Sequence, residues 1–221
     1  MNFIFDPSLV LYLPLNEKDG SSFTSGDAYG HLCTVTGALW RLNGRYFDGV
    51  DDYIALPASA YRKFADTDDF TIIAWANSSQ LSGAGSIVWL TGELVNHQPT
   101  IGLYFVNSTR ADAWIKSKTA AVSNIASATD LTAGWLHLVV TWQASLEKIS
   151  IFANGVFKAS DSTNSITFAG NDFNYGRIGC WGAGVWAAFY KGLVGEVYLY
   201  KKLLSMQEIQ NIYLATKWRY Q

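Results

Sequence analysis

The acidic side chains of this sequence lack the spacing that cleavage of a glycosidic bond requires. That chemistry uses two carboxyl groups about 5 to 10 Å apart, one to protonate the leaving oxygen and one to attack the sugar or activate water. Alternate residues of a strand share a face, so the expected pattern is Glu-x-Asp-x-Glu or a close variant. Among the glutamates, only Glu17 has an acidic residue two positions away, Asp19, and both fall in a predicted turn. A divergent glycoside hydrolase is therefore kept only as the weaker alternative to a non-enzyme.

Nucleophilic and metal-dependent chemistry finds no better support. The sequence has no Gly-x-Ser-x-Gly elbow, and its histidines, among them the mid-strand His137, show no metal-ligand spacing. Cys33 and Cys180 are too far apart for a cysteine metal motif, and two buried free thiols are a better prediction than a disulfide between them. Asp48, Asp51 and Asp52 flank a glycine, where turn chemistry is a better prediction than a metal site.

Aromatic side chains are the strongest sign of a binding function. Nine Trp and twelve Tyr exceed what a core demands, and sugars bind by stacking their apolar faces on such rings. Three tryptophans in strong strand patterns are predicted to pack within the fold: Trp75, Trp135 and Trp142. Trp181 and Trp186 bracket a glycine-rich segment, CWGAGVWAAFY, which we expect to be a loop at the edge of the fold. The predicted ligand-binding set is Trp89, Asn96, His97, Trp114, Tyr175, Trp181 and Trp186.

The composition is that of a globular domain with a large core. The chain has 221 residues, of which 49% are hydrophobic and 15% charged, which excludes disorder and favours one domain over residues 1–221. A net charge of −2 argues against nucleic acid or an anionic membrane as a partner. The first residues carry no Lys or Arg and soon meet Asp6 and Pro7, unlike a secretory signal. Localisation stays open between the cytoplasm, a virion and export by another route.

Nearly all of the periodicity is that of strands. Residues 69–76 (DFTIIAWA) and 135–143 (WLHLVVTWQ) alternate with apolar residues on both faces, which predicts central strands covered on both sides. Asn154-Gly155 lies between two alternating runs and predicts a two-residue hairpin turn. Ser205 to Glu208 forms a capping box, so we expect one short helix over 205–215. The pattern predicts an all-β sandwich of two antiparallel sheets with a short C-terminal helix.

In this order the segments resemble the laminin-G-like branch of the concanavalin A-like lectin and glucanase superfamily. The resemblance rests on LVLYLPLNEKDG, RYFDGVDDYIALP, DFTIIAWA, GWLHLVVTW, ISIFANGVFKAS and GLVGEVYLYKKLLSMQEIQNIY, which cover nearly the whole chain. It implies a concanavalin A-like jelly roll.

The same resemblance implies one further candidate, a calcium site. Relatives often hold one Ca²⁺ between an early acidic loop and a late strand, which makes Asp27 the candidate ligand. This chain has Gly195-Glu196 where calcium-binding relatives often have Asp-Glu. The loss of that carboxylate leaves the site short of oxygen ligands.

Two functional hypotheses follow, because this fold serves both binding and structural roles. The first is a non-catalytic, lectin-like module that binds a glycan or a glycan-bearing surface through the aromatic residues. The alternative is a structural or assembly protein, such as a subunit or decoration of a viral particle or appendage, in which the same rings contact protein or another copy of the chain.

Overall fold

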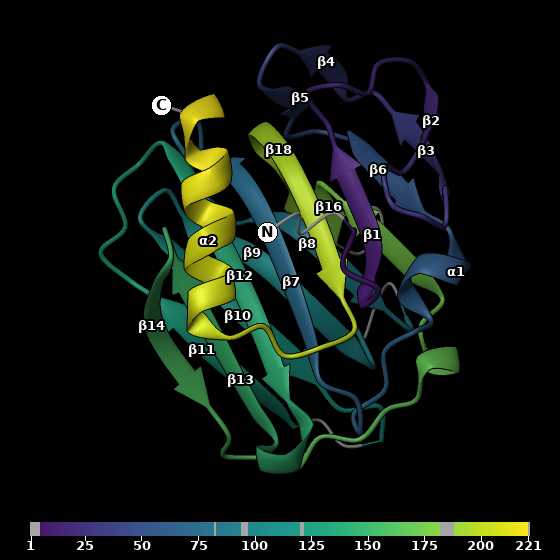
Figure 1. Cartoon of the computed structure of the whole chain (residues 1–221), viewed down its shortest axis with the longest axis vertical. Helices are drawn as coiled ribbons and strands as arrows, with labels where there is room; N and C mark the ends of the chain where they lie inside the picture. The colour runs from purple at the N-terminus through teal and green to yellow at the C-terminus, as the bar shows by residue number, and fades with distance from the viewer. Residues whose placement is uncertain (1–4, 82, 94–96, 120–121, 182–187, 221) are drawn as a thin grey trace.

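The computed structural model describes residues 5–81, 83–93, 97–119, 122–181 and 188–220. Over these residues the chain forms two antiparallel sheets of eight strands each, a two-stranded ribbon and one longer helix near the C-terminus (Figure 1). The predicted all-β sandwich with a short C-terminal helix is therefore confirmed. Within the described part of the chain, no helix has the length and apolar character needed to cross a membrane.

The first sheet has the strand order β14-β13-β12-β7-β18-β5-β4, and β1 also pairs with β18. In that order its strands are β14 (Val156–Asp161), β13 (Lys148–Ala153), β12 (Trp135–Gln143), β7 (Phe70–Asn77), β18 (Lys191–Tyr200), β5 (Gly44–Asp48) and β4 (Leu39–Arg41), with β1 (Leu9–Pro14) beside β18.

The second sheet has the order β11-β10-β9-β8-β15-β6-β3-β2. Its strands are β11 (Ser123–Ala128), β10 (Arg110–Lys116), β9 (Thr100–Asn107), β8 (Gly85–Thr91), β15 (Tyr175–Ile178), β6 (Tyr53–Leu56), β3 (Leu32–Thr36) and β2 (Ser22–Thr24). The ribbon pairs β16 (Cys180–Trp181) with β17 (Ala188–Phe189). The helical segments are α1 (Ala58–Tyr61), η2 (Ala144–Leu146), η3 (Gly170–Asp172), α2 (Met206–Thr216) and η5 (Lys217–Arg219).

The main core lies between the two sheets. Alternate residues of β7 enter it, Phe70, Ile72 and Ala74 among them, while Ile73 on the other face of the strand belongs to a second apolar cluster. That second cluster lies between the first sheet and α2, and it includes Ile209 of the helix. The prediction that β7 is covered on both faces is therefore correct, because the helix shields the face that the second sheet does not.

Helix α2 begins where the capping box predicts. The Ser205 hydroxyl accepts a hydrogen bond from the Glu208 amide, and the Glu208 carboxylate accepts one from the Ser205 amide at 2.8 Å. Leu204 and Ile209 are both buried in the second cluster, so an apolar contact accompanies the cap. Figure 1 shows α2 across the first sheet, over β7 and β12.

Two shorter predictions also hold. Asn154 and Gly155 both have positive φ angles, 52° and 77°, and join β13 to β14 as a tight hairpin. Cys33 and Cys180 are free and buried, as expected for two thiols that pack as small apolar side chains.

Candidate ligand-binding site

The outer face of the second sheet carries a row of large side chains that face away from the core. Strand pairing sets Trp114 of β10 opposite Gly102 of β9, Gly102 opposite Trp89 of β8, and Trp89 opposite Arg177 of β15. Residues directly opposite one another in antiparallel strands point to the same face. Two tryptophans and one arginine therefore lie in one line across four neighbouring strands.

Gly102 makes this arrangement possible. A Cβ atom at this position would lie deep inside van der Waals contact with the six-membered ring of Trp89. Glycine thus allows the Trp89 indole to lie across β9 toward Trp114. A side chain of any size at residue 102 would push the two indoles apart.

Five rings gather around this point, and we call Trp89, His97, Tyr104, Trp114 and Trp181 the aromatic patch. The centroid of the Trp89 ring lies 5.0 Å from that of Trp181, 5.5 Å from Trp114, 5.6 Å from His97 and 6.0 Å from Tyr104. The Tyr104 and Trp181 rings are also 5.3 Å apart, in an edge-to-face contact. Trp89 is therefore the centre of the patch.

The rings differ in how much surface they offer. Trp89 is only 1% exposed, so the other rings of the patch cover it. Tyr104, Trp114, Trp181 and His97 are half-buried and retain surface that a ligand can cover. Half-exposed aromatic rings on a rigid sheet suit stacking against the apolar face of a sugar.

An ion pair between a buried carboxylate and an exposed guanidinium supports one side of the patch. The Asp112 carboxylate is 2% exposed and accepts two hydrogen bonds from the Arg110 guanidinium, each 2.9 Å. It also accepts one from the Tyr104 hydroxyl at 3.2 Å, and this carboxylate contributes to the raised pKa of Tyr104 after burial itself. Asp112 therefore fixes the Tyr104 ring at the patch.

Asp112 has no second carboxylate across from it. Its register partners are Ser127 of β11 and Tyr104 of β9. The paired acids that glycosidic bond cleavage uses are thus missing at this position of the sheet.

Basic side chains border the patch on two sides. The Lys116 ammonium lies 5.9 Å from the centroid of the Trp114 ring. The Arg177 guanidinium lies 4.7 Å from the Tyr53 ring and 5.8 Å from the Tyr175 ring. Both cations face aromatic rings, which holds them beside the patch.

The structure brings together four of the seven predicted ligand-binding residues. Trp89, His97, Trp114 and Trp181 are members of the patch. Tyr175 lies beside it, 40% exposed, on the strand that carries Arg177. Asn96 and Trp186 lie outside the described residues.

The edge loop expected around Trp181 begins later than predicted, because Trp181 itself lies within the ribbon strand β16. Trp89 lies within β8, Trp114 within β10 and Tyr175 within β15. The rings stand on the face of the sheet because Gly102 leaves room for them there. The sequence analysis missed Tyr104. This residue lies two positions after Gly102 on β9, so the two-residue alternation places it on the same face as Gly102 and its partner Trp114.

The predicted calcium ligand, the Asp27 carboxylate, accepts hydrogen bonds from the backbone. Its two carboxylate oxygens accept hydrogen bonds from the Tyr12 amide at 2.8 Å and the Tyr29 amide at 2.9 Å. Glu196, from the late strand, is 1% exposed and pairs with the Arg219 guanidinium at 2.7 Å. Among the described residues, Asp27 belongs to no group of three metal-ligating side chains. Both Asp27 oxygens thus already accept hydrogen bonds, and the calcium site stays a prediction.

Asp48, Asp51 and Asp52 have carboxylate oxygens within 4.8 Å of one another. The Asp52 carboxylate accepts a hydrogen bond from the Asp48 amide, and the Asp48 carboxylate accepts one from the Val50 amide. These are the turn contacts that the sequence predicts. Burial and the two neighbouring carboxylates raise the pKa of Asp52.

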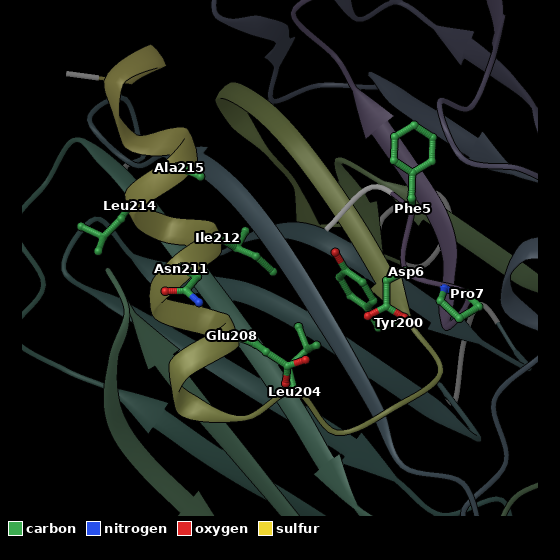
Figure 2. A pocket seen from close by; sticks show the side chains of 10 residues that line it. All are labelled: Phe5, Asp6, Pro7, Tyr200, Leu204, Glu208, Asn211, Ile212, Leu214 and Ala215. Atoms are coloured by element: carbon green, nitrogen blue, oxygen red, sulfur yellow. The ribbon is translucent and has the colours of Figure 1, made fainter. Parts of the chain in front are cut away.

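A hollow of about 660 Å³ lies on the opposite side of the molecule, beside α2. Figure 2 shows it between the N-terminal segment, the end of β18 and the helix. Its polar groups are already bonded, since Lys202 pairs with Asp6 at 2.6 Å and with Glu208 at 2.8 Å. Its lining residues are Phe5, Asp6, Pro7, Tyr200, Leu204, Glu208, Asn211, Ile212, Leu214 and Ala215.

A comparison with protein families identifies the family of this chain. The model of a concanavalin A-like lectin/glucanases superfamily family, Laminin_G_3, matches residues 48–210. The chain belongs to this family, as the sequence resemblance indicates. A comparison with curated proteins gives no match.

Solved structures share the fold at low sequence identity. Domain 4 of AbnA, a GH43 extracellular arabinanase from Geobacillus stearothermophilus, in complex with arabinotriose, has a TM-score of 0.68 and 16% identity, over 93% of this chain and 98% of that one. Trypanosoma rangeli sialidase has a TM-score of 0.69 and 17% identity, over 98% of this chain and only 34% of that one. The receptor binding domain of botulinum neurotoxin D has a TM-score of 0.69 and 11% identity, over 94% of this chain and 52% of that one.

Proposed function

We propose that this protein is a non-catalytic carbohydrate-binding module whose ligand covers the aromatic patch. The observation that carries the proposal is the assembly of Trp114, Tyr104 and Trp181 around a buried Trp89 on the outer face of a sheet. Half-exposed rings on a sheet offer flat apolar surface next to hydrogen-bonding groups.

The comparisons support the ligand class without fixing it. The AbnA domain covers almost the same length as this chain and was solved with arabinotriose. Two other similar structures contain this fold as part of a longer chain, one a sialidase and one a toxin receptor-binding domain. The presence of this fold in an arabinotriose-bound domain, a sialidase and a receptor-binding domain supports a glycan or a glycan-bearing surface as the partner.

Two single substitutions test the proposal. Trp114→Ala and Trp181→Ala should each weaken binding to a glycan identified on an array by about 1 to 3 kcal/mol, which is the usual loss for a stacked ring in a binding site. Isothermal titration calorimetry measures the affinity, and circular dichroism checks that both variants fold. Trp186, an original member of the predicted set, is tested in the same way.

Trp218→Ala is the matched control. Trp218 lies in η5, is 67% exposed and belongs to the side of the molecule that carries α2. Its removal should leave the affinity unchanged. Full affinity in both patch variants would remove the patch from the binding site.

A protein-contact role is the second candidate. Three large apolar side chains are well exposed near β4 and the C-terminus: Leu39 at 53%, Leu42 at 79% and Trp218 at 67%. Exposed apolar groups of this kind often mark protein contacts. Light scattering at several concentrations tests this role: a large, discrete assembly that Leu42→Ser dissolves would favour it, and a stable monomer would favour glycan binding.

A further inference from the structure

Four buried polar atoms on the outer face of the second sheet have no hydrogen-bond partner among the described residues. They are Ser86 Oγ, Trp89 Nε1, His97 Nδ1 and Trp114 Nε1. Native proteins leave few buried polar groups unpaired, because an unmade hydrogen bond in a dry site costs free energy. Four such atoms in one place are therefore unusual and need an explanation.

The four atoms belong to one site. Three of them are on rings of the aromatic patch, where the Trp89 centroid lies 5.5 Å from that of Trp114 and 5.6 Å from that of His97. Ser86 is directly opposite Tyr104 in the pairing of β8 with β9, so it shares their face. The unpaired atoms thus surround the rings to which the proposed ligand binds.

The unpaired atoms are mainly hydrogen-bond donors. An indole N–H only donates, while a serine hydroxyl and a histidine nitrogen can donate or accept. A ligand that satisfies this group must therefore bring acceptor oxygens. The hydroxyl groups of a neutral sugar offer both roles, but a carboxylate offers acceptors alone and makes the stronger, charge-assisted bonds.

The charges around the patch favour a negative ligand. The Lys116 ammonium faces the Trp114 ring, and it contributes, after burial, to the lowered pKa of His97. Arg177 is directly opposite Trp89. The negative charge of Asp112 is compensated by the Arg110 guanidinium at 2.9 Å. Two basic side chains therefore stand beside the patch, where they can contact a negative ligand, although the net charge of the chain is −2.

We infer that the aromatic patch takes a carboxylate-bearing saccharide, whose acid group accepts hydrogen bonds from the indole N–H groups of Trp89 and Trp114 beside Lys116 and Arg177. This inference rests on the proposed function and specifies its ligand class. The apolar face of the sugar stacks on the half-exposed rings. Since the donor atoms are shielded from solvent, binding includes side-chain rotation within the patch, which is common at binding sites.

Indole N–H signals in ¹H–¹⁵N spectra give a direct readout. Trp89→Phe and Trp114→Phe assign the two signals. The probes are tri-galacturonate, a tetrasaccharide of alternating glucuronate and N-acetylglucosamine, and sialyllactose, each compared with its methyl ester. For at least one acid we expect both indole signals to shift and the affinity to exceed that of the ester at least tenfold, because the ester lacks the charge.

Charge variants provide the second test. Lys116→Gln and Arg177→Gln should each reduce the preference for acid over ester by up to about fivefold, the usual size for a partly exposed charge. Lys158→Gln is the matched control, since Lys158 is exposed on β14 of the other sheet. That variant should keep the preference.

The outcomes separate the two proposals. Equal affinity for acid and ester, or binding only of neutral saccharides at Trp114 and Trp181, would overturn the inference and leave the carbohydrate-binding proposal in place. An acid preference that leaves the Trp89 and Trp114 indole signals unmoved would also overturn it. If no saccharide on a broad array binds the protein, both proposals fail.

Discussion

Acid should destabilise this protein through His137, and a substitution there should remove the effect. The His137 side chain is fully buried on β12, with its ring centroid 5.2 Å from that of Trp75 and 5.7 Å from that of Tyr213 on α2. Neither of its ring nitrogens has a hydrogen-bond partner among the described residues. Burial disfavours the charged form and lowers the pKa of His137 from 6.5 to about 3.

The direction and size of the effect follow from linkage. The unfolded chain takes up a proton at His137 as the pH falls below about 6.5, whereas the folded protein does so only near pH 3. The contribution of the neutral ring to stability is therefore complete above pH 6.5 and is lost as the pH falls toward 3. The loss amounts to about 2 kcal/mol at pH 5 and about 3 kcal/mol at pH 4.

Two variants separate the effect of His137 protonation from the effect of its buried polar atoms that lack hydrogen-bond partners. His137→Phe fills a ring-sized space without polar atoms, so it should be more stable than the parent protein at pH 7 by about 1 to 2 kcal/mol and should lack this acid dependence. His137→Gln keeps unpaired polar atoms but does not titrate, so we expect it to be less stable at pH 7 with the same flat profile.

Urea unfolding followed by circular dichroism at pH 7, 6, 5 and 4 gives the free energies of unfolding. Other buried groups, such as Glu196 with its raised pKa, titrate alike in all three proteins and cancel in the differences. Free energies that fall in parallel for the parent and both variants would refute the reasoning, because His137 would then contribute nothing to the acid dependence.

Three further predictions concern the patch, the calcium question and the N-terminal segment. Gly102→Ala should displace the Trp89 ring, cost about 1 to 3 kcal/mol of stability in urea unfolding and weaken glycan binding, whereas an unchanged affinity would show that the ring position is not needed. Calcium and chelator should leave the melting temperature unchanged, because the Asp27 oxygens already bond to backbone amides; a rise that Asp27→Asn abolishes would establish a site there. Lys202→Met should lower the free energy of unfolding by at most about 1 kcal/mol, since the two ion pairs that it removes are partly exposed. It should also speed proteolysis of the N-terminal segment before Ser8. Unchanged cleavage would show that these ion pairs do not hold that segment in place.

Sequence reasoning succeeds where the signal is local. The Asn154-Gly155 turn and the Ser205 cap each depend on a few consecutive residues whose conformational preferences act wherever the chain places them. The alternation of β7 is equally local, and its two apolar faces predict two covering layers. These elements together predict the fold class.

The site is harder to predict because its residues meet through register and through space. Trp89, Trp114 and Trp181 come from three strands far apart in the sequence, and alternation alone does not tell which strands lie side by side. Gly102 gave no signal in the sequence as a residue that makes room for an indole. Periodicity places His137 in a strand, yet only the packing of α2 shows that its ring nitrogens are buried without partners.

The covering of the two sheets explains why the proposed site lies on the second one. Both sheets carry aromatic side chains on their outer faces, Trp75 on the first and Trp89 on the second. On the first sheet the C-terminal segment stacks on Trp75, through Tyr213 of α2 at 5.8 Å and Tyr220 at 4.5 Å. The Trp75 indole N–H also finds a partner, the Thr216 hydroxyl, at 2.9 Å. The indole N–H groups of Trp89 and Trp114 have none among the described residues. An indole is thus a structural element where the C-terminal helix accepts a hydrogen bond from its N–H group. It is a candidate for recognition where the described residues offer that group no acceptor.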